Sequence, residues 1–241
     1  MQSTTSIIVD PLQPAGAGKR PVRANTSLEE QDIRVAVEAW GRKRFGDVRV
    51  IHELALGERR IDMVFVGTAD IVGVEIKGPR DSLSDGRLSE QLREFNFYLP
   101  EVWLAIAPRW QKHRDVKRRQ NLLLTTEQGM EVVKDKGNGK FKPERDEFFC
   151  SRLIELLWVD EAARIAQRTD VIPGVTLTRE PVWKVKRMLA RMLSGHEIVK
   201  QVCIELRARP LVGLGSDRPM RELPSPLPAS AGRGRPAKQG G

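Results

Sequence analysis

The sequence has few of the residues that build secreted or membrane proteins. Aromatic side chains make up 5% of its 241 residues, with a single tyrosine, Tyr98. No apolar run approaches the roughly 18 residues of a membrane-spanning helix, and the N-terminal segment lacks the basic start and apolar stretch of an export signal. The two cysteines, Cys150 and Cys203, lie far apart and match no zinc-site spacing. We therefore expect a cytoplasmic protein with buried, free thiols.

Positive charge is plentiful, but it gathers at the two ends of the chain. The net charge is +9, while an apolar content of 40% is enough for one hydrophobic core and a smaller second one. Residues 1–26 carry a net +2 and residues 207–241 a net +5, which leaves +2 for residues 27–206. A polyanionic partner such as nucleic acid is indicated, although by the tails more than by the folded core.

The stretch from Arg60 to Lys77 predicts a β-hairpin. Two runs, Ile61–Val66 and Ile71–Lys77, are rich in β-branched residues, and turn-forming residues join them. Closing the hairpin on that turn sets Asp62 opposite Glu75. The two-residue period of a strand puts Lys77 on the same face as Glu75 and turns Ile76 to the other, apolar face.

Two facing carboxylates need a physical reason, because like charges opposite one another destabilise a sheet. A divalent cation supplies one: Mg²⁺ prefers hard oxygen ligands and keeps other positions for water and substrate phosphate. Lys77 would then orient or deprotonate the attacking water. The alternative interpretation is a solvated hairpin face, since polar residues alternate with apolar ones on any half-exposed strand.

The Asp-x12-Glu-x-Lys spacing of Asp62, Glu75 and Lys77 resembles the motif of the PD-(D/E)XK nuclease superfamily. The resemblance implies an α/β fold, with a restriction-endonuclease-like α/β/α core around a central mixed sheet. It also implies Mg²⁺ or Mn²⁺ held by Asp62, Glu75 and the backbone carbonyl of Ile76, with Lys77 as a catalytic residue.

The segment before the hairpin predicts a capped helix from residue 27 to about Gly46 and then a strand from Val48 to Leu56. The period of that strand puts Glu53 on one side; because the sequence does not fix the turn register after Leu56, a third carboxylate beside Asp62 is a hypothesis. The side of the strand that carries Glu53 also carries Arg49, Ile51 and Ala55. The opposite side carries Val48, Val50, His52, Leu54 and Leu56.

After the hairpin, a helix is expected over RLSEQLREFNFYL, followed by a buried strand from Val102 to Ala107. Gln91 and Phe95 match a Gln-x-x-x-aromatic pattern of several branches of the superfamily. In that resemblance Gln91 reaches back to the metal site or the DNA backbone; an exposed helix glutamine is the alternative. A further strand pair is expected around Gly137-Asn138-Gly139.

Basic side chains are concentrated between Pro108 and Gln120. On a loop or short helix they would neutralise DNA phosphates, unless they form only a solvated surface. The basic residues of this stretch are Arg109, Lys112, Arg114, Lys117, Arg118 and Arg119. In the C-terminal tail, Arg233 and Arg235 lie in a Gly-Arg-Gly-Arg-Pro stretch that resembles an AT-hook core for the minor groove.

The C-terminal third of the folded region is expected to be helical, with a capping box from Ser194 to Glu197. Leu156-Leu157-Trp158-Val159-Asp160-Glu161 is similar to a Leu-Leu-Trp-x-x-Glu element in an uncharacterised bacterial and phage branch of the superfamily. Leu206-Arg207-Ala208-Arg209 is similar to the Leu-x-x-Arg-like stretch that ends that branch. The resemblance thus spans about residues 28–209.

The sequence predicts four segments: a disordered lead-in (1–26), a nuclease-like core (27–147), a helical extension (148–209) and a disordered basic Pro/Gly-rich tail (210–241). The function implied by the resemblance is a metal-dependent deoxyribonuclease of phage or bacterial DNA processing, repair or defence, with RNA as a second candidate substrate. A homodimer is plausible, because many such nucleases pair to cut both strands. The alternative is a catalytically inactive nucleic-acid-binding or regulatory protein on the same fold.

Overall fold

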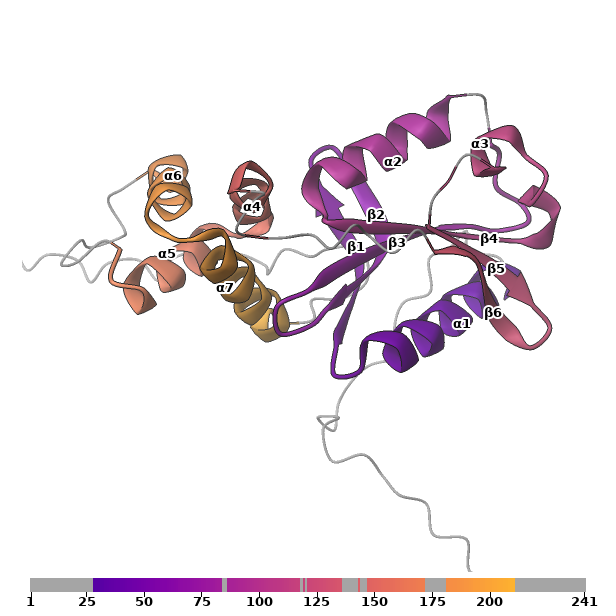
Figure 1. Cartoon of the computed structure of the whole chain (residues 1–241), viewed down its shortest axis with the longest axis horizontal. Coiled ribbons are helices and arrows are strands. Elements are labelled where there is room, and N and C mark those ends of the chain that lie inside the picture. Colours follow the sequence, from indigo (N-terminus) through magenta and orange to yellow (C-terminus); the bar gives the residue numbers. More distant parts are fainter. Residues whose placement is uncertain are drawn as a thin grey trace, which may run out of the picture.

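A six-stranded sheet forms the centre of the computed structural model (Figure 1). The structure describes residues 28–83, 86–117, 119, 121–135, 143, 147–171 and 181–210. The strands are neighbours in chain order: β1 (Arg49–Leu56), β2 (Arg59–Val66), β3 (Ile71–Lys77), β4 (Glu101–Ile106), β5 (Asn121–Thr126) and β6 (Gly129–Asp135). The pairs β3–β4 and β4–β5 are parallel and the other three are antiparallel, so the predicted mixed sheet is confirmed.

The β2–β3 hairpin has the predicted register. Val66 pairs with Ile71 and Met63 with Val74, and the turn closes where Gly67 N–H donates to the Asp70 carbonyl at 2.8 Å. The β-branched, alternating runs extend readily as strands, and the turn fixes which residues face each other.

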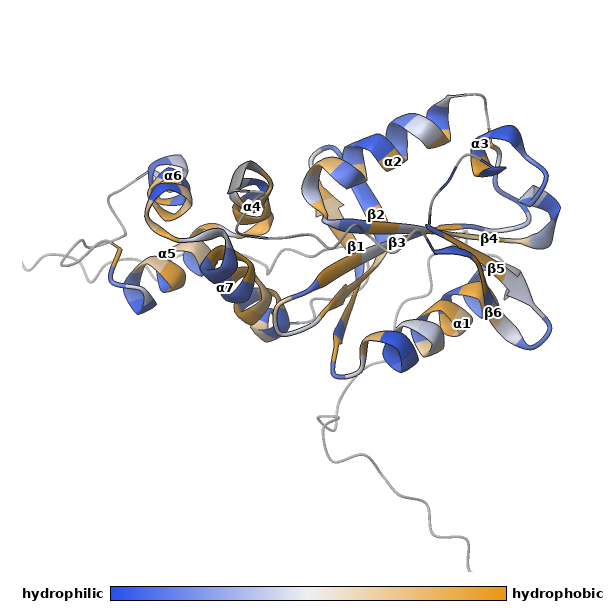
Figure 2. Ribbon diagram, in the orientation of Figure 1, coloured by the Kyte–Doolittle hydropathy of each residue, from blue (hydrophilic) through white to orange (hydrophobic). Residues whose placement is uncertain are grey.

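Helices cover both faces of the sheet, as an α/β/α arrangement requires. Helix α1 (Leu28–Phe45) packs Ile33 and Val37 on one face, in a cluster that includes Phe65 and Trp103. Helix α2 (Arg87–Tyr98) packs Leu88, Leu92 and Phe95 on the other face. Both helices turn apolar residues toward the strands (Figure 2). The predicted α/β core, with a helix, three strands, a helix and a strand in order, is confirmed.

Strands β1 and β2 exchange faces at Glu53 and Asp62. The ladder passes from the His52–Met63 pair to the Leu54–Ile61 pair, and Glu53 between them has a positive φ of 59°. Val50 and Met63 belong to the α1 side of the core, whereas Leu54 and Ile61 belong to the α2 side. The single alternation predicted for residues 48–56 is therefore wrong beyond Glu53, because the left-handed backbone reverses which way the strand's side chains point.

The second predicted strand pair is present, but its turn lies earlier than expected. Strands β5 and β6 pair Thr126 with Gly129, so the hairpin turns at Glu127 and Gln128. Gly129 supplies a φ of 117° at that turn, a conformation that glycine adopts without strain. The expected turn at Gly137-Asn138-Gly139 lies outside the described residues.

Within the described residues, four helices follow the sheet, as predicted for the C-terminal part. They are α4 (Glu147–Leu153), α5 (Val159–Arg168), α6 (Val182–Met192) and α7 (Gly195–Ala208), with the short 3-10 turn η2 (Ile154–Leu156) after α4. Helix α7 contacts the hairpin directly, because Arg207 Nη1 donates to the Val66 carbonyl at 3.0 Å. Cys150 and Cys203 are buried, as expected, and neither forms a disulfide among the described residues.

The helices of the extension share one apolar cluster with the α2 side of the sheet. The boundary predicted at residue 148 stays a prediction. The lead-in of residues 1–26 and the tail from residue 211 lie outside the described residues. Among the helices that the structure describes, none has the length and apolarity needed to cross a membrane.

Candidate metal centre

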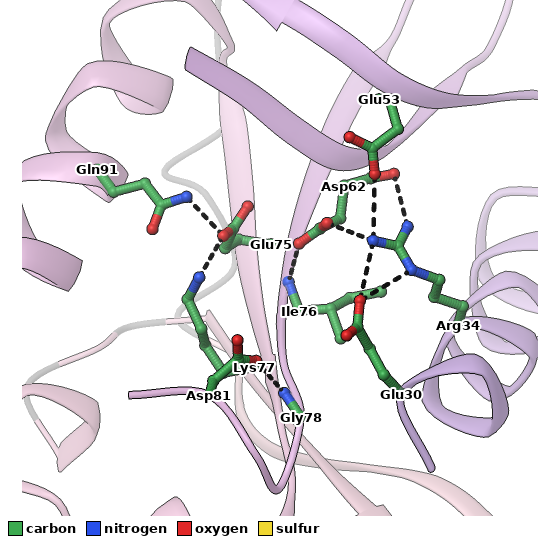
Figure 3. Close-up of polar contacts among 10 residues, drawn as sticks. All are labelled: Glu30, Arg34, Glu53, Asp62, Glu75, Ile76, Lys77, Gly78, Asp81 and Gln91. Atoms are coloured by element: carbon green, nitrogen blue, oxygen red, sulfur yellow. Dashed lines mark hydrogen bonds and ion pairs between the residues drawn. The ribbon is translucent and has the colours of Figure 1, made fainter. Parts of the chain in front are cut away.

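Polar side chains from five elements meet beside the β2–β3 hairpin (Figure 3). Helix α1 provides Glu30 and Arg34, β1 provides Glu53, β2 provides Asp62, β3 provides Glu75 and Lys77, and α2 provides Gln91. The centre lies at the point where β1 and β2 exchange faces, so the local backbone irregularity and the polar cluster coincide.

The side chain of Asp62 replaces a backbone hydrogen bond between β2 and β3. The described β2–β3 ladder ends at the Met63–Val74 pair, and the next available N–H, that of Ile76, donates to Asp62 Oδ2 at 2.8 Å. Asp62 Oδ1 accepts from Arg34 Nη2 at 2.5 Å. The carboxylate of Asp62 is thus fixed from two sides between its own strand and the next.

Glu75 is the most deeply buried acid of the centre, at 2% exposure. Its Oε1 atom accepts from Lys77 Nζ and from Gln91 Nε2, each at 2.6 Å, while its buried Oε2 atom has no hydrogen-bond partner among the described residues. Burial raises the pKa of Glu75 well above its usual value and the nearby Asp62 carboxylate raises it further, against the opposing effect of Lys77. The surroundings of Glu75 therefore disfavour its negative charge, which a proton or a bound cation would relieve.

Lys77 and Gln91 both lie where the sequence placed them. Lys77 shares the Glu75 face of β3, and Ile76 turns into the apolar cluster on the other face. Burial alone would lower the pKa of Lys77, but neighbouring carboxylates, led by Glu75, raise it above its usual value. The side chain of Lys77 thus keeps its proton in this state. Its ammonium group can donate hydrogen bonds that orient a water molecule and is less suited to deprotonating one.

Arg34 and Glu30 were missed at the sequence level. The Arg34 guanidinium contacts Asp62, and it also lies 3.2 Å from Glu53 Oε1 and 3.3 Å from Glu30 Oε1. The i, i+4 spacing of Glu30 and Arg34 on a helix was the available signal. The predicted neighbourhood of Glu53 and Asp62 is found, with Arg34 between the two carboxylates.

Of the carboxylate oxygens that the sequence assigned to a cation, both of Asp62 accept hydrogen bonds, and Glu75 Oε2 has no hydrogen-bond partner among the described residues. Among the described residues there is no group of three His, Cys, Asp or Glu side chains arranged to hold a metal. Mg²⁺ needs fewer protein ligands than that, because it is commonly bound by one or two carboxylates and completes its shell with water and phosphate oxygens. The unpartnered Oε2 of Glu75, next to Asp62, fits such an ion; the Ile76 carbonyl belongs to the residue between Glu75 and Lys77.

The basic stretch lies beside the loop that leaves β3. In η1 (Pro108–Trp110), Trp110 Nε1 donates to the Gly78 carbonyl at 2.8 Å, and Arg109 donates to the Pro79 carbonyl. The short helix α3 (Arg114–Lys117) follows. Arg109, Lys112, Arg114 and Lys117 are exposed.

Arg119 differs from the other predicted phosphate contacts. Its guanidinium donates to Ser89 Oγ at 2.6 Å and to the Asp115 carbonyl at 2.8 Å, so it fastens this stretch to α2. Of the remaining predicted DNA contacts, Arg118, Arg233 and Arg235 lie outside the described residues.

Comparison with known proteins adds no family. No family model matches the chain, and no curated protein matches it. A solved structure, described as the SPO1766 protein of unknown function from Silicibacter pomeroyi, matches 62% of this chain and 98% of its own, with 16% identity and a TM-score of 0.38. At that score the likeness carries no argument, so function must be argued from the centre itself.

Proposed function

We propose that this protein is a metal-dependent nuclease of the PD-(D/E)XK type that hydrolyses phosphodiester bonds in DNA. The observation that carries the proposal is the buried, unpartnered Oε2 of Glu75, held next to Asp62 and flanked by Lys77. A buried carboxylate oxygen without a donor is rare, and a bound cation would provide the partner that Glu75 Oε2 lacks.

Each residue of the centre has its own role in the proposed reaction. Asp62 and Glu75, with the Ile76 carbonyl, would hold Mg²⁺ or Mn²⁺. A bound divalent cation supplies Lewis acidity and a more acidic water. Gln91 holds Glu75 Oε1 in place, and Lys77, which shares that oxygen, is placed to orient a water molecule or a phosphate oxygen with its remaining N–H groups.

The substrate class is supported by the charge beside the centre. Trp110 and Arg109 of η1 contact Gly78 and Pro79, directly after Lys77, and the exposed Lys112, Arg114 and Lys117 follow along the chain. Such a row of cations suits a phosphate backbone and carries no base specificity. DNA is the proposed substrate, RNA is the other polymer to test, and a homodimer would allow both strands to be cut.

A second candidate is a nucleic-acid-binding or regulatory protein without turnover. The contact that favours it is Arg34 on Asp62, because the guanidinium already neutralises a proposed metal ligand. This candidate keeps the basic surface and the fold but has no use for a divalent cation.

Calorimetric titration with Mg²⁺ and a cleavage assay on DNA and RNA separate the two candidates. Wild type and the control Asp32→Ala, an exposed acid on α1, should bind the ion and cut. Asp62→Ala should lose both properties, and Lys77→Ala should keep binding but lose cleavage. Absence of metal binding in the wild type, or cleavage that persists in both Asp62→Ala and Lys77→Ala, would refute the nuclease proposal.

A further inference from the structure

The Arg34 guanidinium lies beside Asp62 and Glu53, where a bound cation would be most stabilised. Its Nη2 atom lies 2.5 Å from Asp62 Oδ1 and 3.2 Å from Glu53 Oε1, and its Nη1 atom donates to the Asp62 carbonyl at 3.3 Å. The side chains of Arg34 and Asp62 are only 14% and 12% exposed. Figure 3 shows the guanidinium reaching from α1 between Glu30, Glu53 and Asp62.

These contacts tie the guanidinium to the same carboxylate that the proposed metal needs. Burial alone would lower the pKa of Arg34, but Asp62, Glu53 and Glu30 raise it above its usual value, so the side chain stays charged. A divalent cation on Asp62 would lie close to this positive charge, and like charges at such distances in a partly buried site repel strongly.

We propose that Arg34 is the resident counter-cation of the centre: it neutralises Asp62 and Glu53 in the metal-free protein and turns away from Asp62 when a divalent cation binds. The inference rests on the proposed metal centre and adds a positioning residue that sets its affinity. Arg34 is not a catalytic residue in this proposal, because it acts through Asp62.

Glu30 provides a place for the displaced guanidinium. It lies one helical turn before Arg34 and already accepts from Arg34 Nε at 3.4 Å and Nη2 at 3.3 Å. Its side chain is 22% exposed, compared with 12% for Asp62, so it lies nearer the surface. Arg34 can therefore keep an ion pair on its own helix while it gives up Asp62, without movement of the α1 backbone.

The presence of Arg34 favours the binding of divalent over monovalent cations. A monovalent ion that displaced Arg34 would exchange one positive charge for another, whereas a divalent ion adds one positive charge to the carboxylates. The counter-cation therefore disfavours occupation by Na⁺ or K⁺ and admits ions such as Mg²⁺ or Mn²⁺.

Mg²⁺ titrations of the full chain with Arg34→Met and Arg34→Lys test the proposal. Arg34→Met keeps an unbranched side chain but removes the competing charge, so its Kd for Mg²⁺ should fall by about tenfold or more. Arg34→Lys retains the charge and should stay closer to wild type. Arg42→Met is the matched control, because Arg42 lies two turns further along α1 and pairs with Glu38 at the surface; its Kd should not change.

A merely structural Arg34 would give the opposite sign, since loss of its hydrogen bonds would loosen Asp62 and weaken metal binding. Unchanged or weaker binding by Arg34→Met, beside normal binding by the wild type, overturns this inference and leaves the nuclease proposal intact. Absence of binding in the wild type overturns both.

A second measurement needs no variant and covers the case in which Arg34→Met does not fold. The ¹⁵Nε resonance of Arg34 in the wild-type protein should move on addition of Mg²⁺ but not of equal ionic strength in Na⁺. A resonance that stays fixed while calorimetry records Mg²⁺ binding would also overturn the inference.

Discussion

Arg209 and Glu161 form a fully buried, two-point ion pair between the end of α7 and the first turn of α5. Arg209 Nε donates to Glu161 Oε1 at 2.8 Å and Nη2 donates to Oε2 at 2.6 Å, with the two side chains 3% and 0% exposed. The guanidinium also lies over the Trp158 ring, 3.9 Å from its centroid, and donates to the Leu156 carbonyl at 2.9 Å. The two sequence elements that stood out in the helical extension, Leu-Leu-Trp-x-x-Glu and Leu-x-x-Arg, are thus partners in space.

Removing the charge of Glu161 should therefore destabilise the protein strongly. In Glu161→Gln the Arg209 guanidinium would remain buried without a counter-charge, and losing one partner of a buried pair costs about 3–5 kcal/mol. Urea unfolding followed by circular dichroism measures the change. Lys200→Ala on α7 is the control, because its pair with Glu197 is exposed and such a pair contributes at most about 1 kcal/mol. Equal effects of the two substitutions would contradict the importance of the buried pair.

Glu75→Gln should have the opposite effect in the absence of metal. Glu75 is buried beside Asp62, so its negative charge is unfavourable in the folded protein. An amide in its place can still accept from Lys77 and Gln91 through Oε1, and it fills the position of the unpartnered oxygen with a donor. We expect a gain of about 1–2 kcal/mol at neutral pH, together with loss of metal binding.

The pH dependence of that gain follows from the direction of the pKa shift. The pKa of Glu75 is raised in the folded protein, so folding of the wild type is penalised increasingly as pH rises above the usual carboxyl value of 4.5. The advantage of Glu75→Gln should be absent near about pH 4 and present near about pH 8, measured by urea unfolding in a chelator. Glu58→Gln, an exposed acid between β1 and β2, should show no such difference. A Glu75→Gln protein less stable than wild type at the higher pH would contradict this account.

Local features of the hairpin made its register predictable. β-branched alternation on each side of a short turn leaves one pairing that keeps Ile76 on the apolar face, and the structure has it. The same reasoning failed at Glu53, because its positive φ is imposed by the surroundings in a residue other than glycine. The position of the β5–β6 turn was missed for a different reason: Gly129 was a weaker local turn signal than Gly137-Asn138-Gly139.

The contacts of Arg34 with the carboxylates could not be predicted from the sequence. Its contacts to Glu53 and Asp62 join residues 19 and 28 positions away along the chain, and they depend on how α1 is laid across the sheet. Strand periodicity identified the carboxylates, since it is a local property. Their counter-cation is a tertiary property, and the i, i+4 spacing of Glu30 and Arg34 does not distinguish this arginine from Arg42, which pairs with Glu38 at the same spacing.

The position of α1 rests on a close contact that glycine permits, and this gives a last prediction. A Cβ atom at Gly41 would lie 2.1 Å from the ring of Phe65, which is 1% exposed. In an exposed helix, Gly→Ala stabilises by roughly 0.5–1 kcal/mol. Here the helix must shift or the ring must move, so we expect Gly41→Ala to cost about 1–3 kcal/mol in urea unfolding.

The contact also links packing to the centre, because Arg34 lies two turns before Gly41 on the same helix. A shifted α1 would move the guanidinium away from Asp62, so Gly41→Ala should change Mg²⁺ affinity in the direction expected for Arg34→Met, if by less. The background Phe65→Ala removes the ring and should abolish the cost of Gly41→Ala, which a double-mutant cycle measures. If Gly41→Ala is instead as stable as wild type, α1 tolerates displacement from β2, and the placement of Arg34 must depend on its own ion pairs more than on the packing of its helix.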